Sequence, residues 1–160
     1  KQGEVEDFKV EFTPEDMNVT IKEVIKETKK AVDITDAKVL VSGGRGIGSA
    51  DYYKELQKVA DLLGGEISSS RANVDAGWIA KDRQVGQTGK TVRPDLYLAC
   101  GISGAIQHIA GMENSECVIS INKNDTAAIF DVSDLGIVGD VKVIIPKLID
   151  ALTKYKAAQN

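Results

Sequence analysis

Hydrophobic and polar positions follow two rhythms along the chain. Short apolar runs that end near glycine, serine or asparagine predict buried strands, and apolar residues three or four apart predict amphipathic helices. The expected strands lie at 39–42, 66–70, 95–100, 117–122 and 136–139. The expected helices lie at 50–63, 73–80, 105–110 and from Val141 to about residue 158, the last one interrupted or started at Pro146. Strands that alternate with helices predict an α/β fold with a doubly wound, mostly parallel sheet and helices on both faces.

A different pattern precedes this alternation. Residues 19–32 carry apolar side chains at helical spacing among Lys and Glu, which predicts a linker helix over 19–35 that packs on the main domain. Residues 8–12 alternate like a strand with no partner nearby, and the chain begins at Lys1. We therefore expect a fragment in which 1–18 end a preceding domain and 36–160 form the main domain.

Composition narrows the function classes. The 160 residues are 42% hydrophobic and 28% charged, as expected for one globular domain with a core. The net charge is -4 and no basic block carries interleaved aromatics, which argues against nucleic-acid binding. No apolar stretch approaches the roughly 20 residues that span a bilayer, and the charged start lacks a signal region. From both observations we expect an intracellular protein. Cys100 and Cys117 lack metal-site spacing, so we expect buried free thiols and no metal.

A glycine-rich loop, GISGAIQHIAG at 101–111, follows the expected strand at 95–100. A loop that leaves a buried strand and enters a helix directs free backbone N–H groups at an anion. Gly101 and Gly104 allow close backbone approach and Ser103 adds a hydroxyl donor, which predicts a phosphate cradle rather than a plain capped turn.

A second glycine-rich loop, VGQTGK at 85–90, precedes the same strand. Gly86 and Gly89 bracket Gln87 and Thr88, so the loop can lie flat against a planar ligand with the threonine hydroxyl directed at it. The other interpretation is a surface turn, and Lys90 is expected to be solvated.

Further candidates also lie at the carboxyl ends of expected strands, where doubly wound sheets bind ligands. GGRGIGS at 43–49 lacks the last glycine of a dinucleotide fingerprint, so it is either a tight turn or, through Arg45, a contact to a phosphate or a ring edge. Arg71 is the first residue after 66–70. Asn122 and Asp140 each follow an apolar run. Each is either a ligand contact or an ordinary helix cap or turn residue.

Five strings carry a resemblance to a known family. In order and spacing, the chain resembles the FAD-binding domain of electron transfer flavoprotein alpha subunits over about residues 36–157. The strings are SSSRANVDAGW at 68–78, VGQTGK at 85–90, GISGAIQH at 101–108, INK at 121–123 and LGIVGD at 135–140. The resemblance implies a Rossmann-like domain that binds FAD.

The resemblance also implies roles for single residues. Arg71 would lie beside the isoalloxazine ring, Thr88 would hydrogen-bond flavin N5, and His108 would donate to the pyrimidine carbonyl next to N1. Judged alone, His108 would be a structural histidine, and Trp78 is expected in the core rather than stacked on the flavin. Arg45 would contact the cofactor, Ser70 its phosphate region, and Asn122 and Asp140 its adenosine half. The full set expected to bind FAD is Arg45, Ser70, Arg71, Val85, Gly86, Gln87, Thr88, Gly89, Ser103, Gly104, Ala105, Ile106, Gln107, His108, Asn122 and Asp140.

The implied function is that of an electron carrier in which FAD performs the chemistry and no residue acts as nucleophile, general acid or general base. The implied partners are the electron transfer flavoprotein beta subunit and flavin-dependent acyl-CoA or other dehydrogenases, in the bacterial cytoplasm or the mitochondrial matrix. Simple relay and electron bifurcation both stay open. The alternatives are a nucleotide-binding middle domain like that of thiamine-diphosphate enzymes or sirtuins, and a cofactor-free scaffold.

Overall fold

The computed structural model describes residues 3, 6–10 and 32–159. The chain divides into two units, residues 1–31 and 32–160. In the first unit, residues 6–10 form no helix or strand, so the strand expected at 8–12 is absent from its described part. Most of the expected linker helix lies outside the described residues, and at its expected end residues 34–35 form a turn.

A five-stranded, wholly parallel sheet organises the second unit, in the order β2-β1-β3-β4-β5. Its strands are β1 (Val39–Gly43), β2 (Glu66–Ser69), β3 (Leu96–Cys100), β4 (Val118–Asn122) and β5 (Leu135–Val138). The central strands β1 and β3 are almost completely buried, because a parallel sheet has both faces covered. The predicted doubly wound α/β fold is confirmed.

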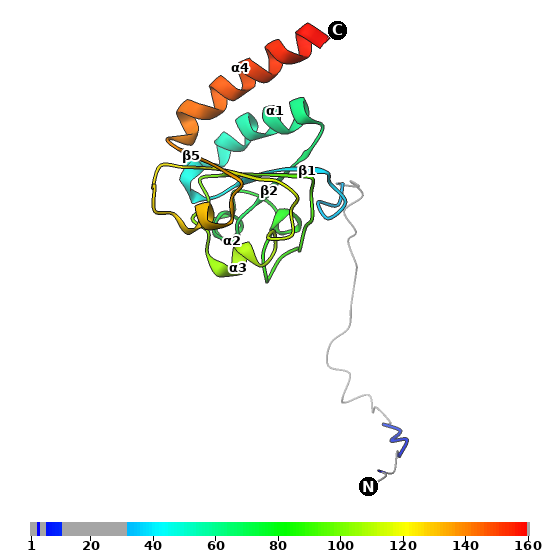
Figure 1. Cartoon of the computed structure of the whole chain (residues 1–160). Helices are drawn as coiled ribbons and strands as arrows, with labels where there is room; N and C mark the ends of the chain where they lie inside the picture. Colours follow the sequence, from blue (N-terminus) through cyan, green and yellow to red (C-terminus); the bar gives the residue numbers. More distant parts are fainter. Residues whose placement is uncertain (1–2, 4–5, 11–31, 160) are drawn as a thin grey trace. The chain divides into compact units, whose positions relative to one another are not determined.

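Helices cover both faces of the sheet (Figure 1). The two long helices α1 (Tyr53–Leu63) and α4 (Val141–Gln159) lie on one face, and the short helices α2 (Arg71–Asp75) and α3 (Ile106–Ile109) lie on the other. Four 3-10 helices complete the described part of the chain: η2 (Arg45–Ile47), η3 (Ala50–Tyr52), η4 (Lys81–Arg83) and η5 (Ala128–Val132). No helix within the described residues is long and apolar enough to cross a bilayer.

Each face has its own hydrophobic core. Leu56 and Val59 of α1 pack with Val41 of the sheet in one cluster, and Trp78 joins its edge as expected for a core residue. Tyr97 of β3 packs with Met112 in the other cluster. Burial of such side chains contributes roughly 1.5–3 kcal/mol each, so the two clusters hold the layers together.

Two helix predictions need correction. The helix expected at 73–80 instead covers Arg71–Asp75, because Gly77 adopts a left-handed φ of 71° that ends it. The last helix is not broken at Pro146 but runs through it from Val141. Asp140 caps that helix by accepting a hydrogen bond from the Lys142 backbone N–H at 2.8 Å.

The two cysteines are both free, but their surroundings differ. Cys100 at the end of β3 is fully buried, and burial raises the pKa of its thiol to about 12. Cys117 is only half-buried, so the expectation of a buried thiol is wrong for this residue.

The loops that follow β1 and β3 touch through their backbones. The Gly44 N–H donates to Cys100 O at 2.9 Å, and the Gly46 N–H donates to Gly101 O at 3.0 Å. A Cβ at Gly44 would lie 2.7 Å from the Cα of Ile102 and would collide with the Gly101 carbonyl. Only glycine at position 44 allows this approach.

Gly44→Ala should therefore destabilise the domain by about 3 kcal/mol or more, because backbone atoms that cannot rotate away block the added methyl group. The control is Gly64→Ala, where φ is 69° but no atom lies within 4 Å of the added Cβ. That control should lose only about 1–2 kcal/mol from left-handed strain. Chemical denaturation of both variants measures the difference, and equal losses would contradict the contact.

Candidate functional site

A cavity of about 720 Å³ lies at the carboxyl edge of the sheet, within the usual size range of ligand pockets. Its walls come from the loops after β1, β2, β3 and β4 and from residues 84–88. The strand order reverses between β1 and β3, which is the position where doubly wound sheets bind ligands. Most of the predicted site residues line it: Arg45, Ser70, Arg71, Val85, Gly86, Gln87, Thr88, Ser103, Ala105, Gln107, His108 and Asn122.

Four predicted site residues do not line this cavity. Ile106 at the start of α3 is 81% exposed, and Gly89 lies in the turn of the loop beside it. Asp140 lines a small cavity of about 40 Å³ next to the first one. Gly46, Gly101 and Asn122 line both cavities, so the two are neighbours along the sheet edge. The fourth predicted site residue outside the main cavity is Gly104.

Gly104 serves the fold more directly than the sequence suggested. It is buried with a φ of 89°, and an added Cβ would lie 2.6 Å from the carbonyl carbon of Ala128 and collide with the backbone nitrogen of Ile129. The Ile129 N–H donates to Ser103 O at 3.1 Å and holds the loop there. The expectation that this glycine opens the loop to an anion is therefore incomplete, because its close approach is to the chain itself.

The start of α2 brings charge to the cavity. The Ser70 backbone N–H donates to Gly43 O at 3.1 Å, and its side chain makes no capping hydrogen bond. Arg71 Nε lies 3.2 Å from Asp75 Oδ2, and both side chains line the cavity. Sequence analysis missed Asp75, although its spacing of four from Arg71 on a helix indicates such a pair. The carboxylate offsets part of the charge that Arg71 offers a ligand.

A buried network fixes this corner of the site. Asn73 Nδ2 donates to Gly43 O at 3.1 Å and to Tyr53 Oη at 2.9 Å. The Tyr53 hydroxyl also lies 2.6 Å from Ser69 Oγ. The network joins β1, β2, α1 and α2 behind the cavity, so Ser70 and Arg71 start from a rigid base.

The loop at 84–90 is closed by its own backbone. The Lys90 N–H donates to Gln84 O at 2.8 Å, and the Gly86 N–H returns a bond to Lys90 O at 3.1 Å. The Gln87 N–H donates to Gln107 O at 2.7 Å, which fixes the loop against α3. These backbone hydrogen bonds hold Thr88 at the cavity wall.

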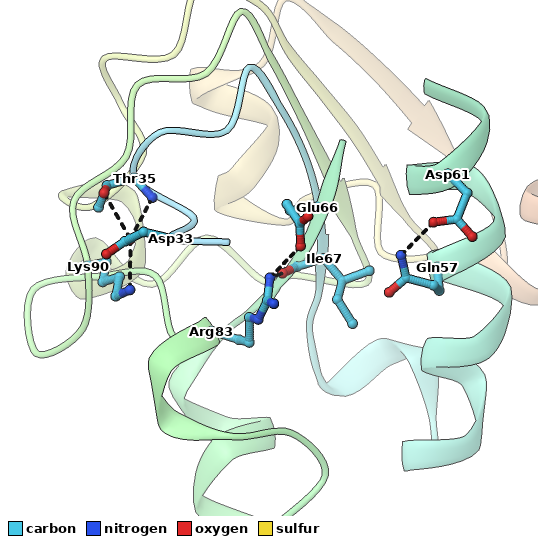
Figure 2. Close-up of polar contacts among 8 residues, drawn as sticks. All are labelled: Asp33, Thr35, Gln57, Asp61, Glu66, Ile67, Arg83 and Lys90. Atoms are coloured by element: carbon cyan, nitrogen blue, oxygen red, sulfur yellow. Dashed lines mark hydrogen bonds and ion pairs between the residues drawn. The ribbon is translucent and has the colours of Figure 1, made fainter. Parts of the chain in front are cut away.

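Ion pairs anchor both ends of this segment (Figure 2). Lys90 Nζ lies 2.8 Å from Asp33 Oδ1, so the expectation that Lys90 is merely solvated is wrong. This pair, with hydrogen bonds from Thr35, holds the pKa of Asp33 well below its usual range. Arg83 Nη1 lies 2.6 Å from Glu66 Oε2 and fixes η4 to β2.

His108 is buried at the cavity wall, with 6% of its surface exposed. Its Nε2 lies 3.0 Å from the hydroxyl of Tyr97, which is fully buried in β3. Burial lowers the pKa of His108 to about 4, and a weaker effect of the Val85 carbonyl acts in the opposite direction. The imidazole is thus neutral at pH 7 and carries one N–H.

The Nδ1 atom of His108 is buried and makes no hydrogen bond of ordinary geometry among the described residues, the Val85 carbonyl being only a weak partner of the ring. Buried polar atoms in proteins are nearly always paired, so an unpaired one beside a cavity fits a site that a ligand completes. Within the part of the chain that the structure describes, no three His, Cys, Asp or Glu side chains gather as metal ligands.

His108 should make folding depend on pH. The unfolded chain binds a proton at this residue below about 6.5, and the folded domain does so only below about 4. The unfolded state therefore binds more protons between these values, and the stability falls by about 3 kcal/mol as the pH drops through that window. Urea unfolding of the chain at a series of pH values measures this loss. A His108→Gln variant should show a flatter profile, and parallel profiles for both proteins would contradict the buried neutral state.

Comparison with known proteins places this chain in a family. Residues 33–113 match the family described as the electron transfer flavoprotein FAD-binding domain. The electron transfer flavoprotein subunit alpha of Thermoanaerobacterium thermosaccharolyticum is 52% identical over 156 residues, which are 98% of this chain and 47% of that protein.

Two further relatives carry related names. The acryloyl-CoA reductase electron transfer subunit beta of Anaerotignum propionicum is 50% identical over 93% of this chain and 41% of that protein. The mitochondrial electron transfer flavoprotein subunit alpha of Dictyostelium discoideum is 50% identical over 85% of this chain and 39% of that protein. The chain spans about half the length of the relatives it matches, or somewhat less. With a family match across residues 33–113, the chain belongs to the FAD-binding domain family of electron transfer flavoprotein alpha subunits, and its cofactor is FAD.

Proposed function

We propose that the cavity between the loops of β1 and β3 is the FAD site of this chain, and that the chain is the cofactor-holding part of an electron carrier. One observation carries the proposal most directly. The residues of separate sequence motifs, 45, 70–71, 85–88, 103, 105, 107–108 and 122, meet around one cavity at the switch point of the sheet. The unpaired Nδ1 of His108 at that wall supports it.

The donor groups suit the parts of FAD. Ser103 and the backbone N–H groups of its loop would hold the diphosphate, in the way that strand-to-helix loops bind anions. Arg71, Thr88 and His108 would face the flavin ring. Asn122 and Asp140 would hold the adenosine half, because Asn122 lines both cavities and Asp140 lines the small one next to the main cavity.

Bound FAD supplies one- and two-electron transfer, and the protein supplies binding, orientation and electrostatics. Arg71 brings a fixed positive charge to the ring region, and Asp75 offsets part of it. His108 stays neutral at pH 7 and so contributes a dipole rather than a charge. The proposal requires no acid, base or nucleophile from the chain.

The activity of the whole protein is also a proposal. The relatives named as electron transfer flavoprotein alpha subunits imply a beta subunit as partner. The relative named as an electron transfer subunit of acryloyl-CoA reductase favours acyl-CoA dehydrogenases or related flavoenzymes as electron donors or acceptors. We place the protein in the bacterial cytoplasm or the mitochondrial matrix, and the proposal covers both simple relay and bifurcation. Family membership disfavours the thiamine-diphosphate-like, sirtuin-like and scaffold alternatives.

The purified chain should bind FAD at least tenfold more tightly than FMN, because the adenosine contacts at Asn122 and Asp140 are lost with FMN and about 1.4 kcal/mol corresponds to that factor. Fluorescence titration with each flavin measures the ratio. Identification of the cofactor released by heat from protein purified without added flavin is the independent check. Equal affinities would remove the adenosine assignment.

Arg71 and Asp75, the ion pair on α2, should shift the first reduction potential of bound FAD in opposite directions. Arg71→Ala should lower the potential by on the order of 100 mV, because a cation near the ring favours added negative charge. Arg71→Lys should recover only part, since the ammonium lacks the planar fork of donors. Asp75→Asn should raise the potential by removing the offsetting carboxylate. Spectroelectrochemical titration measures the first reduction potential of all three variants. An unchanged potential in Arg71→Ala with FAD retained would contradict the position proposed for Arg71 near the flavin ring.

A further inference from the structure

Gln84 is a buried polar residue of the cavity wall that sequence analysis did not single out. Only 3% of its surface is exposed, and it lines the cavity with Thr88. Its backbone N–H donates to Lys81 O at 3.1 Å, and its carbonyl accepts from the Lys90 N–H at 2.8 Å. Its side chain crosses the loop, and Nε2 donates to Thr88 Oγ1 at 2.9 Å.

The direction of this hydrogen bond determines what Thr88 can offer. An amide nitrogen only donates, so Thr88 Oγ1 is the acceptor in the pair. A hydroxyl has one hydrogen and two lone pairs, and here one lone pair is engaged by Gln84. The hydroxyl hydrogen of Thr88 has no acceptor among the described side chains and backbone groups, and Thr88 lies at the cavity. The hydrogen is therefore available to a ligand in the cavity.

The backbone keeps the two side chains in this relation. The turn between them is closed by the hydrogen bond from the Gly89 N–H to Gly86 O at 2.9 Å. A Cβ at Gly89 would lie 2.9 Å from Gln84 Cγ and would collide with the Gln84 carbonyl, so the loop folds tightly over Gln84. The separation of Gln84 and Thr88 is set by this turn rather than by flexible side chains.

We infer that Gln84 is a positioning residue that turns the hydroxyl hydrogen of Thr88 toward the cofactor, and that this contact stabilises oxidised relative to fully reduced FAD. The inference rests on the proposed FAD site. Oxidised flavin N5 has a lone pair and accepts a hydrogen bond, whereas after two-electron reduction N5 carries a hydrogen and needs an acceptor. A threonine whose hydrogen faces the cavity matches the first form. To accept from the second form it must turn that hydrogen away and use its one remaining lone pair, because Gln84 engages the other.

The test is a set of dissociation constants for oxidised FAD and, under anaerobic conditions, for chemically reduced FAD. The proteins are the wild-type chain, Gln84→Met, Thr88→Val and the double variant. Gln84→Met should weaken oxidised FAD up to about tenfold more than reduced FAD, the size of one net hydrogen bond. In the Thr88→Val background the same change should leave the ratio of the two constants unaltered, because Gln84 acts through Thr88.

Two further variants complete the design. Gln84→Asn keeps an amide but is one methylene too short for Thr88, so it should shift the ratio like Gln84→Met and supplies the measurement if the methionine variant does not fold. Gln57→Met is the matched control, because Gln57 Nε2 makes a comparable hydrogen bond to Asp61 Oδ1 at 2.8 Å on α1 (Figure 2). It should leave the ratio unchanged.

The outcomes separate the inference from the proposed function. If wild type binds FAD but Gln84→Met and Gln84→Asn keep the wild-type ratio, the inference is overturned and the FAD site stands. If Gln84→Met changes the ratio equally with and without the Thr88 hydroxyl, its role is general packing and the inference is again overturned. If the wild-type chain binds neither form of FAD, the proposed site and the inference fail together.

Discussion

The backbone contact between the loops after β1 and β3 is the constraint on which the rest of the site depends. Gly46 donates to Gly101 O at 3.0 Å, and an added Cβ on either residue would lie 2.7 Å from the Cα of the other. Gly101 also needs its left-handed φ of 64°. Because these two loops meet at the point where the strand order reverses, their contact sets the floor of the cavity and the directions in which the flanking loops leave the sheet.

Around this floor, the site is supported mainly by buried polar groups. Asn73 and Tyr53 fix the start of α2, and Tyr97 pairs with His108 beneath α3. Each partner is buried, so loss of one would leave the other unsatisfied at a cost of about 1–3 kcal/mol. Many cavity residues are exposed, so buried groups hold the shape of the site and exposed groups are left accessible in the cavity.

The hydrophobic rhythm of the sequence sufficed for the strands, their parallel arrangement and the edge at which the motifs gather, because burial on both faces dictates near-continuous apolar strands. Resemblance supplied the residue set, most of which lines the cavity. The remaining features of the site are contacts between residues that lie far apart in the sequence or across a loop, and no local pattern specifies them. Asp33 and Lys90 are 57 residues apart, and the packing of Gly104 against Ile129 depends on a distant loop. In the sequence, Gln84 does not differ from an ordinary polar turn residue. Only the folded structure shows that its amide donates to Thr88.

The loop at 84–90 adopts its shape through hydrogen bonds that involve only protein atoms. Ordering a flexible loop of this kind on binding would cost roughly 1–2 kcal/mol of backbone entropy per residue. That cost is already met when the chain folds, so a cofactor entering the cavity loses little affinity to ordering the loop. We therefore expect the segment to keep its shape when the cofactor dissociates, and the empty protein to remain competent for rapid reloading.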